Sequence, residues 1–138
     1  MTDPAQRAFN AYAQVALETT VSGASPHGLI TLLFDGVLKA LRQASAHRVA
    51  GDLAGKGEAL SRAIAIVSEL RLSLAPEHGP EIAERLDALY DYAGWRLVAA
   101  NLENDGKKIE EVEFILAELR SAWVAIEPKP ATAAESAP

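Results

Sequence analysis

Apolar residues recur at steps of three and four along most of the chain, and helix start signals divide this pattern into long segments. Ser25 is suited to cap a helix with Pro26 at the first helical position, where the missing N–H leaves no bond unmade. Asp52 can cap a further segment, Pro80 can begin another, and the Asn-Asp-Gly sequence at 104–106 indicates a turn. The expected helices cover residues 26 to about 48, 53 to about 74, 80 to about 103, and 107 to about 126.

Four long helices with short connections predict an all-α fold, an antiparallel four-helix bundle preceded by a short N-terminal helical segment. In residues 2–17, Phe9 and Tyr12 stand one helical neighbour step apart. The sequence TTVSGAS that follows is typical of a flexible joint, and the proline-punctuated tail EPKPATAAESAP is predicted to be disordered. The expected parts are the N-terminal segment and joint (1–24), the bundle (25–126) and the tail (127–138).

The composition excludes several classes of partner. The net charge is -6 and no basic stripe is present, so neither nucleic acid nor an anionic membrane surface is an expected partner. No apolar run is long enough to cross a bilayer, and no secretory signal pattern begins the chain. Because the chain has no cysteine, disulfides and thiolate metal sites are excluded. We expect a cytoplasmic protein.

The sequence shows no pattern that predicts catalysis. The three histidines are not at metal-ligand spacing, Glu-x-x-His pairs are absent, and GxSxG and P-loop patterns are missing. The residues around His47 only faintly resemble the histidine motif of phosphotransfer domains, since Gly51 lies at a helix break. We expect no metal, no cofactor and no enzyme, although scattered arginines leave an arginine-lined pocket as a remote alternative.

The segment after Pro80 carries more apolar surface than one bundle core needs. One stripe, which we assign to the core, consists of Ile82, Leu86, Leu89, Tyr90, Ala93 and Leu97. A second stripe lies on roughly the opposite side of the same helix. Two apolar faces indicate a second layer: another subunit, a binding partner, or the chain's own residues 2–17. The second stripe consists of Ala88, Tyr92, Trp95, Ala99 and Leu102.

Two single residues continue this excess elsewhere. Leu32 falls among Asp35 and Lys39, outside the core arc of its helix. Phe114 lies among glutamates on the last helix, again away from the expected core. Either residue could be an isolated surface side chain, but both are candidates for contact with a partner.

Several motifs, in the right order and spacing, resemble the FliS family of flagellin-specific export chaperones. They are SPHGLI, LFDG, LYDY, ANLEND and EEVE, within a match that covers about Phe9 to Ile126. The resemblance implies a cytoplasmic chaperone that captures the disordered C-terminal segment of flagellin, blocks premature polymerisation and delivers flagellin to the flagellar type III export apparatus. The segment would become helical as it wraps around the chaperone.

The resemblance also implies a role for the N-terminal segment. The family's N-terminal tyrosine corresponds to Tyr12 and the apolar residue before it to Phe9; with Val15 on the same segment, these are expected to lie at the partner-binding surface. Two departures are Phe34, where many members have tyrosine, and the sequence Ala93-Gly94-Trp95, which places a bulky ring on the second stripe. The second departure is expected to affect which flagellin is accepted.

The residues leave other interpretations open. The chain could be a helical adaptor or chaperone for a different amphipathic partner, it could form a homodimer, and further flagellar regulatory or export proteins could bind it. An all-helical enzyme is a distant third interpretation. The sequence does not identify which flagellin is bound or which groove dominates the affinity.

If Phe9 and Tyr12 partly shield the groove in the absence of flagellin, removing residues 1–17 will change the affinity for flagellin and leave the helix content largely intact. Calorimetry with a flagellin C-terminal peptide measures the first quantity and circular dichroism the second. An unchanged affinity would rule out the shielding role.

Overall fold

The computed structural model describes residues 25–76 and 79–128, which form four α-helices and contain no strand. The expected N-terminal segment with Phe9, Tyr12 and Val15 lies outside the described residues, as do residues 129–138 of the tail. The expected helix boundaries agree closely with those observed. The helices are α2 (Pro26–Val49), α3 (Leu53–Leu72), α4 (Pro80–Glu103) and α5 (Gly106–Ala125).

Local capping explains where the helices begin and where α4 ends. The side chains of Ser25 and Asp52 accept hydrogen bonds from the backbone N–H groups of Gly28 and Gly55, at 3.1 and 2.9 Å. The helix α4 instead starts with Pro80 and has no side-chain cap. It ends at Asn104, whose left-handed backbone (φ 51°) turns the chain towards α5.

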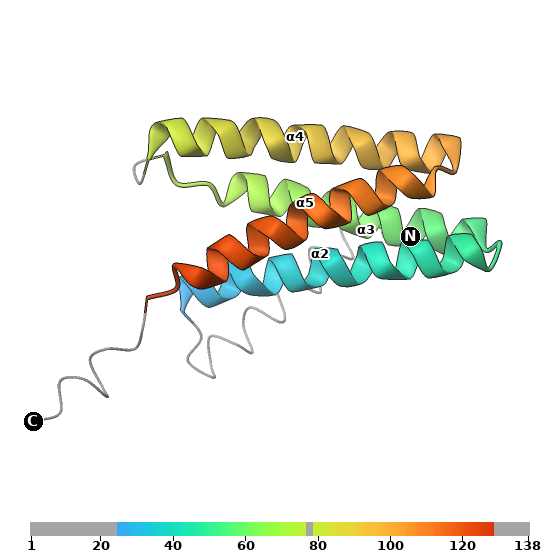
Figure 1. The fold of residues 1–138 in the computed structure, drawn as a ribbon, viewed down its shortest axis with the longest axis horizontal. Coiled ribbons are helices and arrows are strands. Elements are labelled where there is room, and N and C mark those ends of the chain that lie inside the picture. Colours follow the sequence, from blue (N-terminus) through green and yellow to red (C-terminus); the bar gives the residue numbers. More distant parts are fainter. Residues whose placement is uncertain (1–24, 77–78, 129–138) are drawn as a thin grey trace, which may run out of the picture.

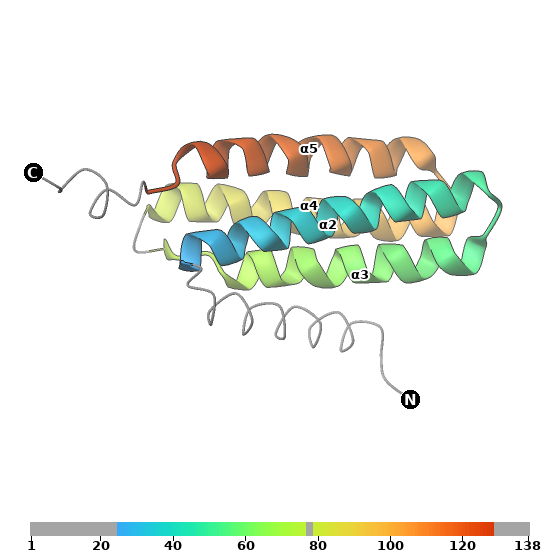
Figure 2. The same cartoon turned by 90° about the horizontal axis from the view of Figure 1, so that it is seen from below.

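Each helix packs against two others. The contacting pairs are α2–α3, α3–α4, α4–α5 and α2–α5, so the helices form a closed ring in which the backbones of the diagonal pairs are not in contact. Consecutive helices run in opposite directions along one long axis (Figures 1 and 2). This arrangement is compatible with the antiparallel four-helix bundle that the sequence predicts.

The core is mainly aliphatic, with Phe34 and Tyr90 as its buried aromatic residues, and it lies between the four helices. α4 contributes one narrow buried stripe, Tyr90, Ala93, Leu97 and Ala100. The prediction that Ile82 belongs to this stripe is wrong, because its side chain is 64% exposed. Ile82 lies on the correct side of the helix but in the first turn, and the buried residues of α4 begin only at Tyr90. From the other helices, the largest fully buried side chains are Val37 and Leu41 of α2, Leu60, Ile66 and Leu70 of α3, and Ile109, Val112 and Leu116 of α5.

Polar contacts join neighbouring helices at both ends of the four-helix arrangement. At one end, the Lys56 side chain is buried and its ammonium donates to the Asn101 carbonyl and the Asn104 side-chain oxygen, at 3.2 and 3.0 Å. At the other end, the rings of His27 and Trp123 stack at 4.0 Å. The Trp123 indole N–H donates to the His27 carbonyl, and the His27 ring nitrogen Nε2 donates to the Trp123 carbonyl. Each of these three side-chain donors therefore has an acceptor.

Two leucines on α4 provide a direct test of this packing. Leu97 is fully buried and Leu102 is 81% exposed. Leu97→Ala is expected to lower the free energy of unfolding by roughly 2–5 kcal/mol, because it leaves a cavity in the core. Leu102→Ala is expected to change it by less than about 0.5 kcal/mol. Urea unfolding measures both; equal effects would contradict the assignment of the two faces.

Candidate partner-binding surface

The outward face of α4 exposes large apolar side chains. Tyr92, Trp95 and Leu102 are 42%, 68% and 81% exposed, and Ala99 between them is half-buried. These residues lie roughly 120–180° around the helix from the buried stripe, at steps of three and four. The second apolar stripe that the sequence predicts is thus present, and no other described helix covers it, since α4 contacts only α3 and α5.

Tyr92 is held on the α5 side of this face. Its hydroxyl donates to a carboxylate oxygen of Glu111 at 2.6 Å, and the Arg96 guanidinium donates to the other oxygen, also at 2.6 Å. The hydrogen bond to Glu111 raises the pKa of Tyr92, and the bonds from Tyr92 and Arg96 lower the pKa of Glu111. These bonds fix the phenol ring in position at the surface, with the Arg96 guanidinium over the ring at 5.9 Å from its centre, and Tyr92 stays 42% exposed.

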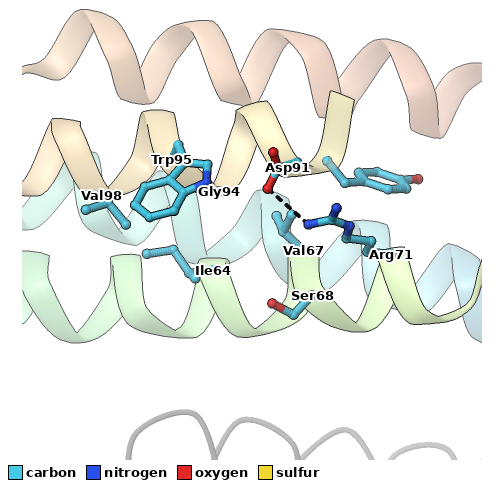
Figure 3. Close-up of a pocket in the computed structure, with 9 residues that line it drawn as sticks. Ile64, Val67, Ser68, Arg71, Asp91, Gly94, Trp95 and Val98 are labelled. Atoms are coloured by element: carbon cyan, nitrogen blue, oxygen red, sulfur yellow. Dashed lines mark hydrogen bonds and ion pairs between the residues drawn. The ribbon is translucent and has the colours of Figure 1, made fainter. Parts of the chain in front are cut away.

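Trp95 is directed to the other side of α4, where a pocket of about 270 Å³ opens between α3 and α4. Figure 3 shows Trp95 and Val98 near Ile64 of α3, on one side of Gly94. Val67 and Ser68 of α3 complete this part of the lining. The pocket is mainly apolar here, and it adjoins the exposed face of α4.

The opposite end of the pocket carries charge. Arg71 of α3 donates to both carboxylate oxygens of Asp87 and to one of Asp91, all at the α3–α4 boundary (Figure 3 shows the Asp91 bond). The hydrogen bond from Arg71 lowers the pKa of Asp87, and that bond also raises the pKa of Arg71. One cation lies between two anions, and all three side chains are more than 40% exposed.

The other candidates lie apart from this face. Phe114 is 66% exposed on the outward side of α5, one turn from Glu111. Leu32 on α2 is half-buried, and α2 does not contact α4, so Leu32 belongs to a different part of the surface. Phe9, Tyr12 and Val15 are not among the described residues.

Sequence reasoning missed the α3 side of the pocket. Ile64 and Val67 follow the core periodicity of α3, so nothing in their spacing distinguishes a pocket wall from the core. The one signal available was Gly94, a glycine in the middle of a long helix, where this residue is disfavoured.

No group of three or more His, Cys, Asp or Glu side chains in residues 25–76 and 79–128 is arranged to hold a metal ion. None of the four helices has the length and apolar character needed to cross a membrane.

Comparison with known proteins gives one consistent family. Residues 8–130 match the family model described as flagellar protein FliS. The flagellar secretion chaperone FliS of Salmonella typhimurium is 51% identical over 122 residues, which cover 88% of this chain and 90% of that protein. The Escherichia coli protein of the same name is 44% identical over 86% of this chain and 88% of its own. The Bacillus subtilis protein is 35% identical over 86% of this chain and 84% of its own. The chain therefore belongs to the FliS family.

Proposed function

We propose that this protein is a cytoplasmic, non-enzymatic export chaperone, built as an antiparallel four-helix bundle, that binds the disordered C-terminal segment of flagellin. By covering the apolar side of that segment, it prevents premature polymerisation and keeps flagellin available for the flagellar type III export apparatus. The names of the relatives, flagellar secretion chaperones, support the chaperone role.

The observation that carries this proposal is the exposed apolar face of α4. A helix in a four-helix ring needs one buried stripe, and α4 has that stripe in Tyr90, Ala93 and Leu97. Trp95 and Leu102 add a second stripe that contributes nothing to the described core. Exposed aromatic and aliphatic side chains in a row are typical of a surface that receives an amphipathic helix.

A flagellin segment that folds as it binds can be both captured and released by the chaperone. A disordered segment that becomes helical on binding loses conformational entropy, so part of the interaction free energy is offset and the affinity is moderate for the area buried. An extended surface on α4, with Phe114 on the neighbouring helix, contacts a long segment without enclosing it. Such a complex can form in the cytoplasm and still dissociate during export.

Trp95→Ala is expected to weaken binding of a flagellin C-terminal segment by about tenfold or more, because large aromatic side chains dominate the binding energy of such surfaces. Isothermal calorimetry measures the affinity. The melting temperature is expected to stay close to that of the wild-type protein, since Trp95 is 68% exposed. A folded wild-type protein that does not bind the segment would overturn the proposed function.

A matched pair of leucines controls for nonspecific loss of apolar surface. Leu102 on the α4 face is 81% exposed, and Leu72 at the end of α3 is 78% exposed. Leu102→Ala is expected to weaken binding several-fold and Leu72→Ala to leave it unchanged. Equal losses in the two variants would show that the α4 face has no special role.

A further inference from the structure

Gly94 occupies a helical position that does not need a glycine for packing. A Cβ atom built at Gly94 meets no heavy atom within 4 Å. At Gly55 and Gly106, by contrast, the same atom would lie 2.5 Å from the His47 ring and 2.8 Å from the Arg48 guanidinium. Glycine is disfavoured inside helices because it loses more backbone freedom on folding than alanine. The chain therefore keeps at position 94 a residue that weakens α4 and relieves no clash.

What Gly94 does is leave space. It lines the pocket between α3 and α4, and a Cβ at this position would lie in open space. We propose that Gly94 is a specificity-determining residue: its missing side chain keeps open a hollow that receives one large apolar side chain from an amphipathic helix of the export substrate. This inference rests on the proposed function and adds to it the subsite and the kind of side chain bound.

The size and lining of the pocket fit one such anchor. Its volume is about 270 Å³, and a dry apolar cavity of roughly 150 Å³ already accommodates a benzene ring. Ile64, Val67 and Val98 supply aliphatic walls, and the Trp95 ring lies at the side of Gly94 (Figure 3). A leucine, methionine or phenylalanine of the substrate would bury its side chain here beside the exposed face of α4.

The charged side chains at the Arg71 end of the pocket restrict which charges the substrate helix can carry. The single positive charge of Arg71 lies between the two negative charges of Asp87 and Asp91, which leaves a net formal charge of -1. Asp91 lies three residues before Gly94 and Asp87 seven, which is about one and two helical turns away. A substrate helix that runs along this groove should therefore carry neutral or basic residues, and no acidic ones, one or two turns from its anchor.

The test uses the full-length chain with Gly94→Leu and Gly94→Ala, and a flagellin C-terminal segment from the same organism as the probe. Gly94→Leu fills the hollow with the chain's own side chain, so the affinity measured by calorimetry should fall about tenfold or more. Gly94→Ala should weaken binding several-fold and raise the melting temperature by roughly 3 °C, because alanine favours the helix.

Gly57→Ala is the matched control. Gly57 is also helical, a Cβ there makes only an ordinary 3.9 Å contact with Asn101, and it does not line the pocket. This variant should melt at a higher temperature and bind the segment as the wild type does. If both Gly94 variants bind as tightly as the wild type, the inference is wrong while the proposed function stands. If the wild type itself does not bind, the proposed function is wrong.

An alanine scan of the flagellin segment, measured against the wild type and against Gly94→Leu, identifies the side chain that enters the pocket. One large apolar residue should lose about tenfold in affinity for the wild type when truncated, and lose almost nothing for Gly94→Leu, because the hollow is already filled. Truncations that weaken binding to both proteins equally would show that no substrate side chain enters the pocket.

Discussion

The position of the exposed apolar face of α4 depends on one constraint, the narrow buried stripe of the same helix. Tyr90, Ala93, Leu97 and Ala100 alternate large and small side chains at steps of three and four, and together they fix the rotation of the helix about its own axis. Once that rotation is fixed, Trp95 must face outwards towards α3. The position of the exposed apolar face of α4 is thus a consequence of core packing.

The same rotation explains why the two sides of α4 differ. Towards α5, Glu111 receives hydrogen bonds from Tyr92 and Arg96, and these close the boundary between the helices. Towards α3, Gly94 presents no side chain. The ion pairs of Arg71 with Asp87 and Asp91 lie nearer the N-terminal end of α4. The pocket between α3 and α4 exists because the packing of side chains on this side of α4 is incomplete. An alanine at position 94 would stabilise α4, because glycine is disfavoured inside helices.

Much of the fold is predictable from the sequence because local chemistry decides it. Ser25 and Asp52 mark helix starts through capping side chains that act within three residues, and Pro80 marks one through its fixed backbone angle and missing N–H. The second stripe of α4 follows from helical periodicity. Periodicity fails for Ile82, which is 64% exposed, because it predicts the side of a helix and not how far the neighbouring helices extend.

The remaining features depend on contacts between distant residues. His27 and Trp123 are 96 positions apart, and nothing near either residue indicates that they stack. Lys56 is a residue type that is almost always exposed, and it is buried here because the left-handed turn at Asn104 brings an oxygen acceptor to it. The pocket likewise arises from the way in which two helices meet.

The chain's two tryptophans allow one direct measurement of the central claim that the outer face of α4 receives the export substrate. Each gives a separate indole N–H signal in a nitrogen-15 NMR spectrum of the full-length protein. On addition of a flagellin C-terminal segment, the Trp95 signal is expected to shift strongly, while the Trp123 signal, held by its hydrogen bond to the His27 carbonyl, stays in place. Binding of the segment with an unchanged Trp95 signal would contradict the account.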